Sequence, residues 1–146
     1  MPLLKSVTAF APASVANVGC GFDIMGFAIN GIGDKVTVSL QLGNDNSRVI
    51  LSGPYSHLIP SEKHKNTAGV AIAAYLQTTG KTGINLSIAL EKNMPLGSGM
   101  GSSASSSAAA VFAVNYLFGS PLSIQELIPF ANVEQKIFVS LSKKTC

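Results

Sequence analysis

The stretch PLGSGMGSSASSSAAA, Pro95–Ala110, constrains the fold of this chain most, because it turns abruptly from glycine and serine to alanine. A glycine- and serine-rich composition by itself is equally typical of a flexible linker. The position of the stretch favours another interpretation, since it follows a segment of alternating apolar residues and leads into one with helical spacing, where long structureless inserts are uncommon. We therefore expect a strand-to-helix turn, with the helix beginning near Gly101, Ser102 or Ser103.

Such a turn has a definite chemistry. Glycines at positions 97, 99 and 101 allow positive φ angles and place no Cβ between the backbone and a ligand, so several N–H groups can point into one concavity. The helix that follows adds unpaired N–H donors and the positive end of its dipole, which attract phosphate. The glycines fall as GxGxG and the Walker lysine is missing, so the sequence predicts a phosphate-binding loop of another kind.

Three segments are predicted to be strands, the first and last because apolar residues alternate strictly along them: residues 35–42, 48–52 and 83–92. The Gly-Asn-Asp-Asn run at 43–46 predicts a tight hairpin between the first two. Together with the helices described next, this order of elements favours an α+β fold built as a two-layer sandwich.

Helices are expected over residues 66–80, in the alanine-rich segment that ends at Phe118, and over residues 123–137. Asn66 supplies a cap and Gly80 a stop for the first. Ser123 and Glu126 match a capping box for the last, while its internal proline predicts an irregular beginning. In the alanine-rich helix, the residues expected to pack on the sheet are Ala108, Val111, Phe112, Asn115 and Tyr116.

The amino-acid composition favours some classes of function over others. The 146 residues, 47% of them hydrophobic, suffice for one domain or part of one. Lysine and arginine outnumber the acids by 10 to 7, which suits a phosphate-bearing ligand, but Arg48 is the single arginine and no basic cluster indicates nucleic-acid binding. Two cysteines indicate a reduced, cytoplasmic setting, with Cys20 expected as a packed small residue, and no apolar segment is long enough to predict a membrane span.

The segment PLGSGMGSSAS, Pro95–Ser105, resembles the nucleotide-binding motif of the GHMP family of small-molecule kinases, with Met100 in place of a leucine. The preceding LEKNM and the segment APASVANVGCGFDIMGFAI, residues 11–29, are similar to the homoserine kinases of that family. The resemblance covers about Lys5 to Ile137. It implies a ribosomal-protein-like α+β domain, in which residues 1–137 form an incomplete nucleotide-binding N-terminal domain and residues 138–146 a divergent tail, with the C-terminal domain missing.

The resemblance implies ATP and Mg²⁺ as cofactors and L-homoserine as the substrate whose hydroxyl is phosphorylated. Asn17 and Asp23 match homoserine-binding residues, while Ser103 and Glu134 match Mg²⁺ ligands. Helix capping for Ser103, an Asx-turn for Asp23 and a solvated surface position for Glu134 are the structural alternatives. No residue is assigned as a catalytic base. The residues that match the loop around the ATP phosphates are Pro95, Leu96, Gly97, Ser98, Gly99, Met100, Gly101, Ser102, Ser103, Ala104 and Ser105.

The sequence departs from the family pattern near its end. A His-x-Asp-Asn segment is expected close to positions 142, 144 and 145, where this chain has Ser142, Lys144 and Thr145. We therefore expect a truncated or frame-shifted chain with little turnover, which self-associates through an exposed domain face. The alternatives are an inactive ATP-binding fragment, another small-molecule kinase of the family, and an RNA-binding module, against which the scarcity of arginine speaks.

Overall fold

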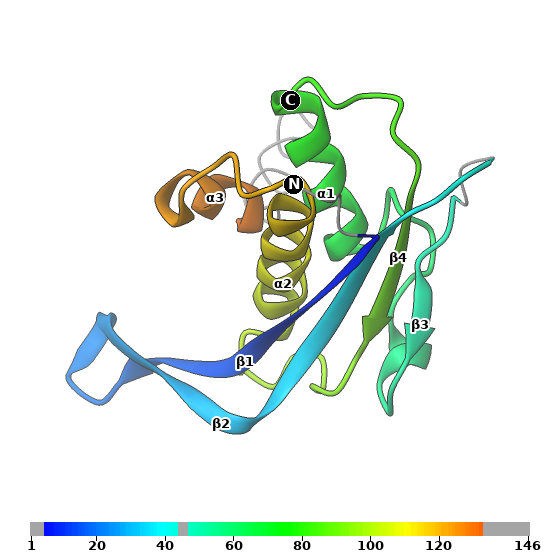
Figure 1. The fold of residues 1–146 in the computed structure, drawn as a ribbon. Helices are drawn as coiled ribbons and strands as arrows, with labels where there is room; N and C mark the ends of the chain where they lie inside the picture. Colours follow the sequence, from blue (N-terminus) through cyan, green and yellow to red (C-terminus); the bar gives the residue numbers. More distant parts are fainter. Residues whose placement is uncertain (1–4, 44–46, 133–146) are drawn as a thin grey trace, which may run out of the picture.

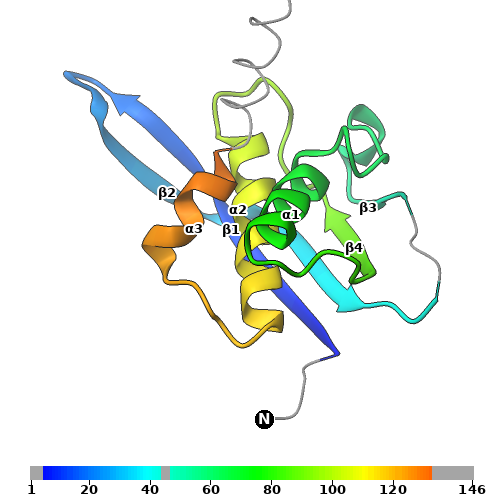
Figure 2. The same cartoon turned by 90° about the horizontal axis from the view of Figure 1, so that it is seen from above.

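The structure is a computed structural model that describes residues 5–43 and 47–132. Within these ranges, one four-stranded sheet carries helices on one of its faces, as Figures 1 and 2 show. This arrangement confirms the predicted α+β two-layer sandwich. The elements in chain order are β1 (Ser6–Val18), β2 (Gly21–Leu40), β3 (Ile50–Ser52), the short 3₁₀ turn η1 (Ser56–Leu58), α1 (Thr67–Thr78), β4 (Leu86–Glu91), α2 (Ser102–Leu117) and α3 (Ile124–Ala131).

The strands lie in the order β1-β2-β4-β3, with β3 parallel to β4 and the other pairs antiparallel. The predicted hairpin across residues 43–46 is therefore wrong, because β4 and not β3 occupies the second edge of β2. All six residues of β4 pair with residues 35–40 of β2, and β4 buries every second side chain between the sheet and the helices. β3 has only three residues and offers less pairing. Because β3 and β4 are parallel, the chain needs a long crossover between them, and α1 supplies it.

The second half of β1 and the first half of β2 form a long two-stranded arm that the sequence did not predict. These two halves pair with each other alone and project beyond the helices (Figure 1). Apolar residues and glycines follow one another here in runs such as IMGFAI, residues 24–29, so the segment lacks the alternation that marks a half-buried strand. Cys20 is exposed at the tip of the arm and not packed as expected, because the turn that begins at Gly19 lies far from the core.

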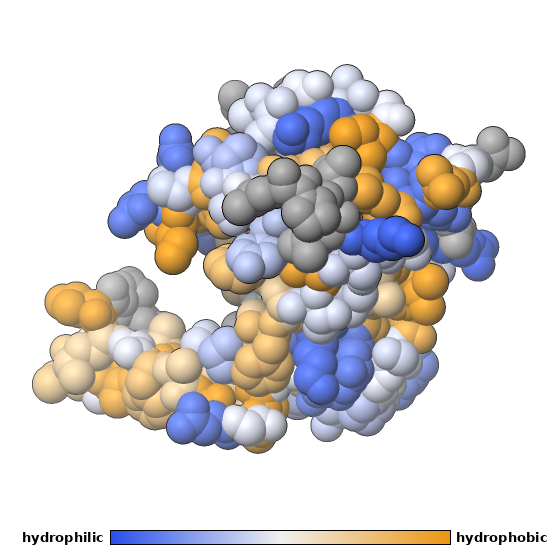
Figure 3. Space-filling view, viewed as in Figure 1, coloured by the Kyte–Doolittle hydropathy of each residue, from blue (hydrophilic) through white to orange (hydrophobic). Residues whose placement is uncertain are grey.

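Large apolar side chains lie exposed on this arm. Ile24 is 87% exposed, and Met25 and Phe27 are each more than half exposed. Figure 3 shows the arm as a mainly apolar projection at the lower left of the molecule. Such a surface is unusual for a soluble domain without a partner. The expected self-association of the chain stays a prediction.

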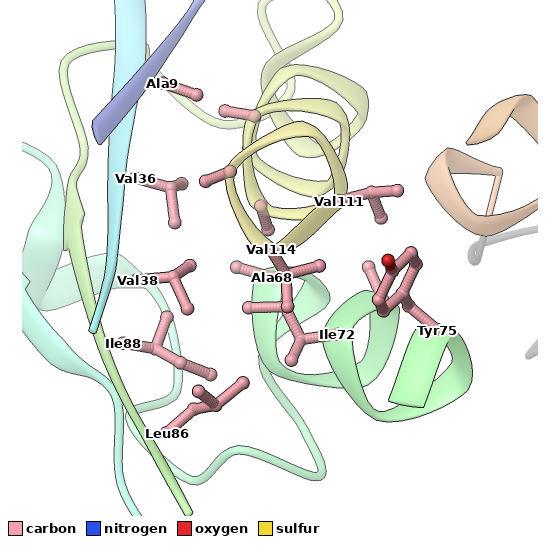
Figure 4. Packing of buried hydrophobic residues seen from close by; sticks show 14 of the residues in the cluster. Ala9, Val36, Val38, Ala68, Ile72, Tyr75, Leu86, Ile88, Val111 and Val114 are labelled. Carbon is pink, nitrogen blue, oxygen red and sulfur yellow. The ribbon is translucent and has the colours of Figure 1, made fainter. Parts of the chain in front are cut away.

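The core lies between the sheet and helices α1 and α2, as Figure 4 shows. Val36 and Val38 of β2 face Val114 of α2 across this interface. Small residues line the inner side of α2 and allow its backbone to approach the sheet closely. Phe112 and Tyr116 are about half exposed, so the prediction that they pack on the sheet is wrong: the close approach leaves no room for large rings. The buried residues of this helix include Ala109, Ala110, Val111, Ala113, Val114, Asn115 and Leu117.

The helix ends follow the sequence closely. The side chain of Asn66 accepts a hydrogen bond from the Ala68 N–H, which confirms the predicted cap of α1. The capping box of Ser123 and Glu126 is present, so α3 begins regularly and not irregularly as expected; Pro129 lies inside it. The part of this helix predicted after residue 132 lies outside the described residues. In the described ranges, no helix combines the length and apolar character that a membrane crossing requires.

Candidate functional site

The glycine- and serine-rich segment is a loop between two regular elements. β4 ends at Glu91 and α2 begins at Ser102, which confirms the predicted strand-to-helix turn. Gly97, Gly99 and Gly101 have φ angles of 69°, 73° and 67°. At Gly101 a Cβ would also lie only 2.8 Å from the Ser14 Oγ. The backbone conformation therefore requires glycine at all three positions, because side chains in the left-handed region are strained.

The loop and the first turn of α2 enclose a hollow of about 170 Å³. Of the eleven residues matched to the loop, the lining ones are Leu96, Gly97, Ser98, Gly99, Gly101, Ser102, Ser103 and Ala104. Gly101 is the N-cap of α2 and brings no side chain to satisfy the first N–H groups of the helix. Backbone donors and the positive helix end thus border one concavity, which is the arrangement that favours an anion.

The serines at the start of α2 have separate contacts. Ser102 donates its hydroxyl to the Met94 carbonyl oxygen at 3.3 Å, and Ser105 donates to the Pro12 carbonyl oxygen at 2.9 Å. Ser103 is the second residue of the helix, so its side chain is not the N-cap. Ser103 borders the loop hollow and also a neighbouring one.

This second hollow, also about 170 Å³, lies where the N-terminal ends of α1 and α2 meet, and the sequence did not predict it. Leu96 and Ser103 border both hollows, so the two are neighbours. No motif marks the second hollow, because its walls come from two parts of the chain that are distant in sequence, residues 58–67 and 92–106. Its lining residues are Leu58, Ile59, Pro60, Lys65, Asn66, Thr67, Lys92, Leu96, Ser103 and Ser106.

Beneath the loop lies a buried cluster of Asp34, Lys92 and Ser106, of which none is more than 2% exposed. The Lys92 ammonium donates to Asp34 Oδ2 at 2.5 Å, to Ser106 Oγ at 2.8 Å and to the carbonyl oxygen of Ser102 at 2.9 Å. Three donors thus meet three acceptors. Ser106 in turn donates to Asp34 Oδ2 at 2.6 Å. A buried ion pair is tolerated when its remaining hydrogen bonds are satisfied in this way.

This cluster is not among the residues predicted from the sequence, although the sequence carries a signal for it. Counted in steps of two residues, Lys92 follows Leu86, Ile88 and Leu90, the buried positions of β4. Asp34 precedes the buried Val36 of β2 by the same step. Successive side chains alternate between the two faces of a sheet, so both charges fall on the side that the helices cover. A lysine and an aspartate at inward positions of two strands predict a buried ion pair.

The arm reaches the loop through two contacts of β1. The Ser14 N–H donates to the Met100 carbonyl oxygen at 3.0 Å, and the Ser105 contact with Pro12 lies at a bulge between Pro12 and Ala13. Asn17 is three residues beyond Ser14 in β1, roughly 10 Å along an extended strand. Asp23 lies near the start of β2, across the turn from Asn17. Both backbones therefore lie toward the tip of the arm, while Glu134 lies outside the described residues.

The described side chains offer few ligands for a metal ion. In residues 5–43 and 47–132, no group of three or more histidine, cysteine or acidic side chains is placed to hold a metal ion. The hydroxyl of Ser103 is an oxygen donor of the kind that Mg²⁺ accepts, and this ion usually takes one or two protein ligands together with phosphate oxygens and water. Ser103, at the border of both hollows, fits that chemistry.

Comparison with known proteins identifies the class. The family model of the GHMP kinases N terminal domain matches residues 66–142, more than half of the chain. The chain therefore belongs to the GHMP kinase family.

Within that family, similarity is high to homoserine kinases. The chain is 48% identical over 143 residues to a homoserine kinase of Chloroherpeton thalassium and 42% identical over 139 residues to one of Chlorobaculum tepidum. These alignments cover 92% and 88% of this chain but 44% and 42% of the relatives, so the chain spans less than half of their length.

Solved structures agree with this assignment. The crystal structure of homoserine kinase from Cytophaga hutchinsonii matches with a TM-score of 0.81 and 41% identity, over 90% of this chain and 41% of that one. Mevalonate kinase from Staphylococcus aureus matches with a TM-score of 0.65 at 18% identity, which indicates a common fold alone.

Proposed function

We propose that this chain supplies the nucleotide-binding part of a kinase that transfers the terminal phosphoryl group of ATP to the side-chain hydroxyl of L-homoserine. The observation that carries the proposal is the conformation of the loop. Three of its glycines have positive φ angles, and the last of them, Gly101, is the N-cap of α2 and has no side chain. Phosphoryl transfer relies mainly on positioning and charge stabilisation, and a fixed set of backbone donors provides both.

The two neighbouring hollows suit the two halves of a nucleotide. In the proposal, the phosphates bind in the loop hollow, residues 95–105. The adenosine part binds in the second hollow, where Leu58, Ile59 and Leu96 offer apolar surface and Lys65 a cation. Ser103 borders both hollows, so it lies where the phosphate chain passes from one to the other.

Asn17 and Asp23 are proposed to bind homoserine. An amino-acid substrate presents an ammonium group and a hydroxyl, which a carboxylate and an amide can bind. The contact between Ser14 and Met100 supports this role, because it holds the arm that carries both residues against the loop. Ser103 and Glu134 are proposed to hold Mg²⁺, which supplies neutralisation of phosphate charge when bound.

Homoserine is favoured over other acceptors of the family because the three homoserine kinases compared above are 41–48% identical to this chain, whereas the mevalonate kinase is 18% identical. A nucleotide-binding chain without activity of its own is the second candidate. The departure from the family pattern at Ser142, Lys144 and Thr145 supports it.

A chimera separates these candidates. Residues 5–137 of the chain replace the matching part of the Cytophaga hutchinsonii homoserine kinase, and ADP formation is followed with homoserine, mevalonate or galactose as acceptor. We expect homoserine-dependent turnover within about tenfold of the parent enzyme, a difference of about 1.4 kcal/mol in activation free energy. A folded chimera that binds Mg·ATP but phosphorylates no acceptor supports the inactive candidate, and turnover with another acceptor alone overturns the choice of homoserine.

A further inference from the structure

We infer that Asp34, Lys92 and Ser106 are positioning residues, which hold the glycine-serine loop in its anion-accepting conformation before any ligand binds. The inference rests on the proposed function only for what the loop accepts. The three side chains come from β2, from the residue after β4 and from α2, so they join the three parts of the fold that border the loop.

The cluster fixes both ends of the loop. At the strand end, Asp34 Oδ1 accepts the N–H groups of Asn93 and Met94, at 2.9 and 3.2 Å, so that the chain enters the loop bound to a buried carboxylate. At the helix end, the Lys92 ammonium contacts the first residue of α2 through the Ser102 carbonyl oxygen. One carboxylate therefore sets the separation between the start and the end of the loop.

Ser106 closes the connection. Its hydroxyl accepts from Lys92 and donates to Asp34, one helical turn below Ser102. This links the first two turns of α2 to the same carboxylate that holds Asn93 and Met94. A loop fixed in this way loses less conformational entropy when a ligand binds, which raises its affinity.

The ion pair itself is a poor target for a test. Removal of Asp34 or Lys92 alone leaves an uncompensated buried charge, which strongly destabilises the fold. Ser106→Ala keeps the ion pair and removes only the hydroxyl. Ser107→Ala is its matched control, because Ser107 is an equally buried serine of α2 whose hydroxyl contacts the carbonyl oxygens of Ala104 and Ala131 and not the cluster.

Two measurements on the full chain test the inference. Hydrogen exchange follows the amides of Asn93 and Met94 without ligand, and calorimetric titration measures affinity for inorganic tripolyphosphate. We expect Ser106→Ala to accelerate exchange of both amides by at least about tenfold, and to weaken tripolyphosphate binding by at least about tenfold, with exchange in α1 unchanged. Ser107→Ala is expected to leave the two amides and the affinity unchanged.

The outcomes separate the two proposals. Equal exchange at Asn93 and Met94 in both variants, or acceleration spread equally over α1 and the two amides, overturns the positioning role. If the wild-type chain binds no tripolyphosphate, the proposed function fails, while the exchange contrast still decides whether the cluster holds the loop. If exchange accelerates but affinity is unchanged, the loop is held by the cluster for a purpose other than phosphate binding, and the inference is wrong.

Discussion

The backbone N–H of Ser14 donates to the carbonyl oxygen of Met100 across 3.0 Å, which joins the first strand to a loop that lies eighty-six residues further along the chain. This contact has a functional consequence. The arm that carries Asn17 and Asp23 leaves the body of the protein beside the proposed phosphate site. In the proposed function, the arm that holds the substrate is therefore attached to the loop that holds the nucleotide.

Gly101→Ala tests the loop. The substitution places a Cβ at a φ of 67° and 2.8 Å from the Ser14 Oγ. We expect a loss of about 1–2 kcal/mol in the free energy of unfolding and a rise of at least about tenfold in the dissociation constant for Mg·ATP. Denaturant titration and calorimetry measure these two quantities.

Gly80→Ala is the control for that variant. Gly80 has almost the same φ, 68°, but lies after α1 with open space around its Cβ position. The strained backbone is expected to lower stability without any effect on nucleotide affinity. An equal loss of affinity in both variants contradicts a specific role for the loop.

The proposed Mg²⁺ ligands are tested by Ser103→Ala and Glu134→Gln in the chimera. Each variant removes one oxygen ligand from the proposed site, so each is expected to lower kcat by at least about tenfold, or about 1.4 kcal/mol of transition-state stabilisation. Steady-state kinetics at saturating homoserine give kcat. A kcat close to that of the unsubstituted chimera in either variant removes that residue from the site.

Asp23→Asn in the chimera tests the substrate assignment. The substitution removes the negative charge that is proposed to bind the homoserine ammonium, so we expect a lower kcat/KM for homoserine. The dissociation constant for Mg·ATP, measured on the same sample, is expected to stay unchanged. An unchanged kcat/KM for homoserine makes the assignment of Asp23 wrong.

The capping box of α3 gives a prediction for stability against pH. Hydrogen bonds from the Ser123 N–H and hydroxyl lower the pKa of Glu126 below 4.5. A lowered pKa in the folded state means that the ionised carboxylate adds stability above about pH 4.5, and that this contribution disappears as the pH falls through the folded pKa. Thermal unfolding of wild type and Glu126→Gln is expected to differ at pH 7, and the difference is expected to shrink as the pH falls through the lowered pKa of the folded state. A constant difference over this range contradicts the prediction.

The sequence predicted the elements whose signals are local. The structure confirms three such predictions: the Asn66 cap of α1, the strand that alternates in β4, and the turn from the glycine-rich loop into α2. Each depends on residues that are neighbours in sequence. The phosphate-binding role of the loop stays a prediction.

The elements that the sequence failed to predict depend on distant partners. β3 was expected beside β2, but pairing depends on which strand buries more side chains, and β4 is twice as long. The arm was missed because its runs of apolar residues and glycines do not alternate with polar residues. The cluster of Asp34, Lys92 and Ser106 joins residues up to seventy-two positions apart. Its only signal in the sequence is that Asp34 and Lys92 fall at inward-facing positions, in β2 and directly after β4.

The central claim, that the loop binds the phosphates of a nucleotide, is tested most directly by the amide signals of its glycines. The chain is labelled with ¹⁵N-glycine and titrated with a non-hydrolysable Mg·ATP analogue while two-dimensional NMR spectra are recorded. We predict saturable shifts for Gly97, Gly99 and Gly101, whose backbone forms the loop, and no shift for Gly31 and Gly80, which lie elsewhere. Loop glycines that stay in place at saturating nucleotide, or shifts of equal size at all five positions, contradict the account.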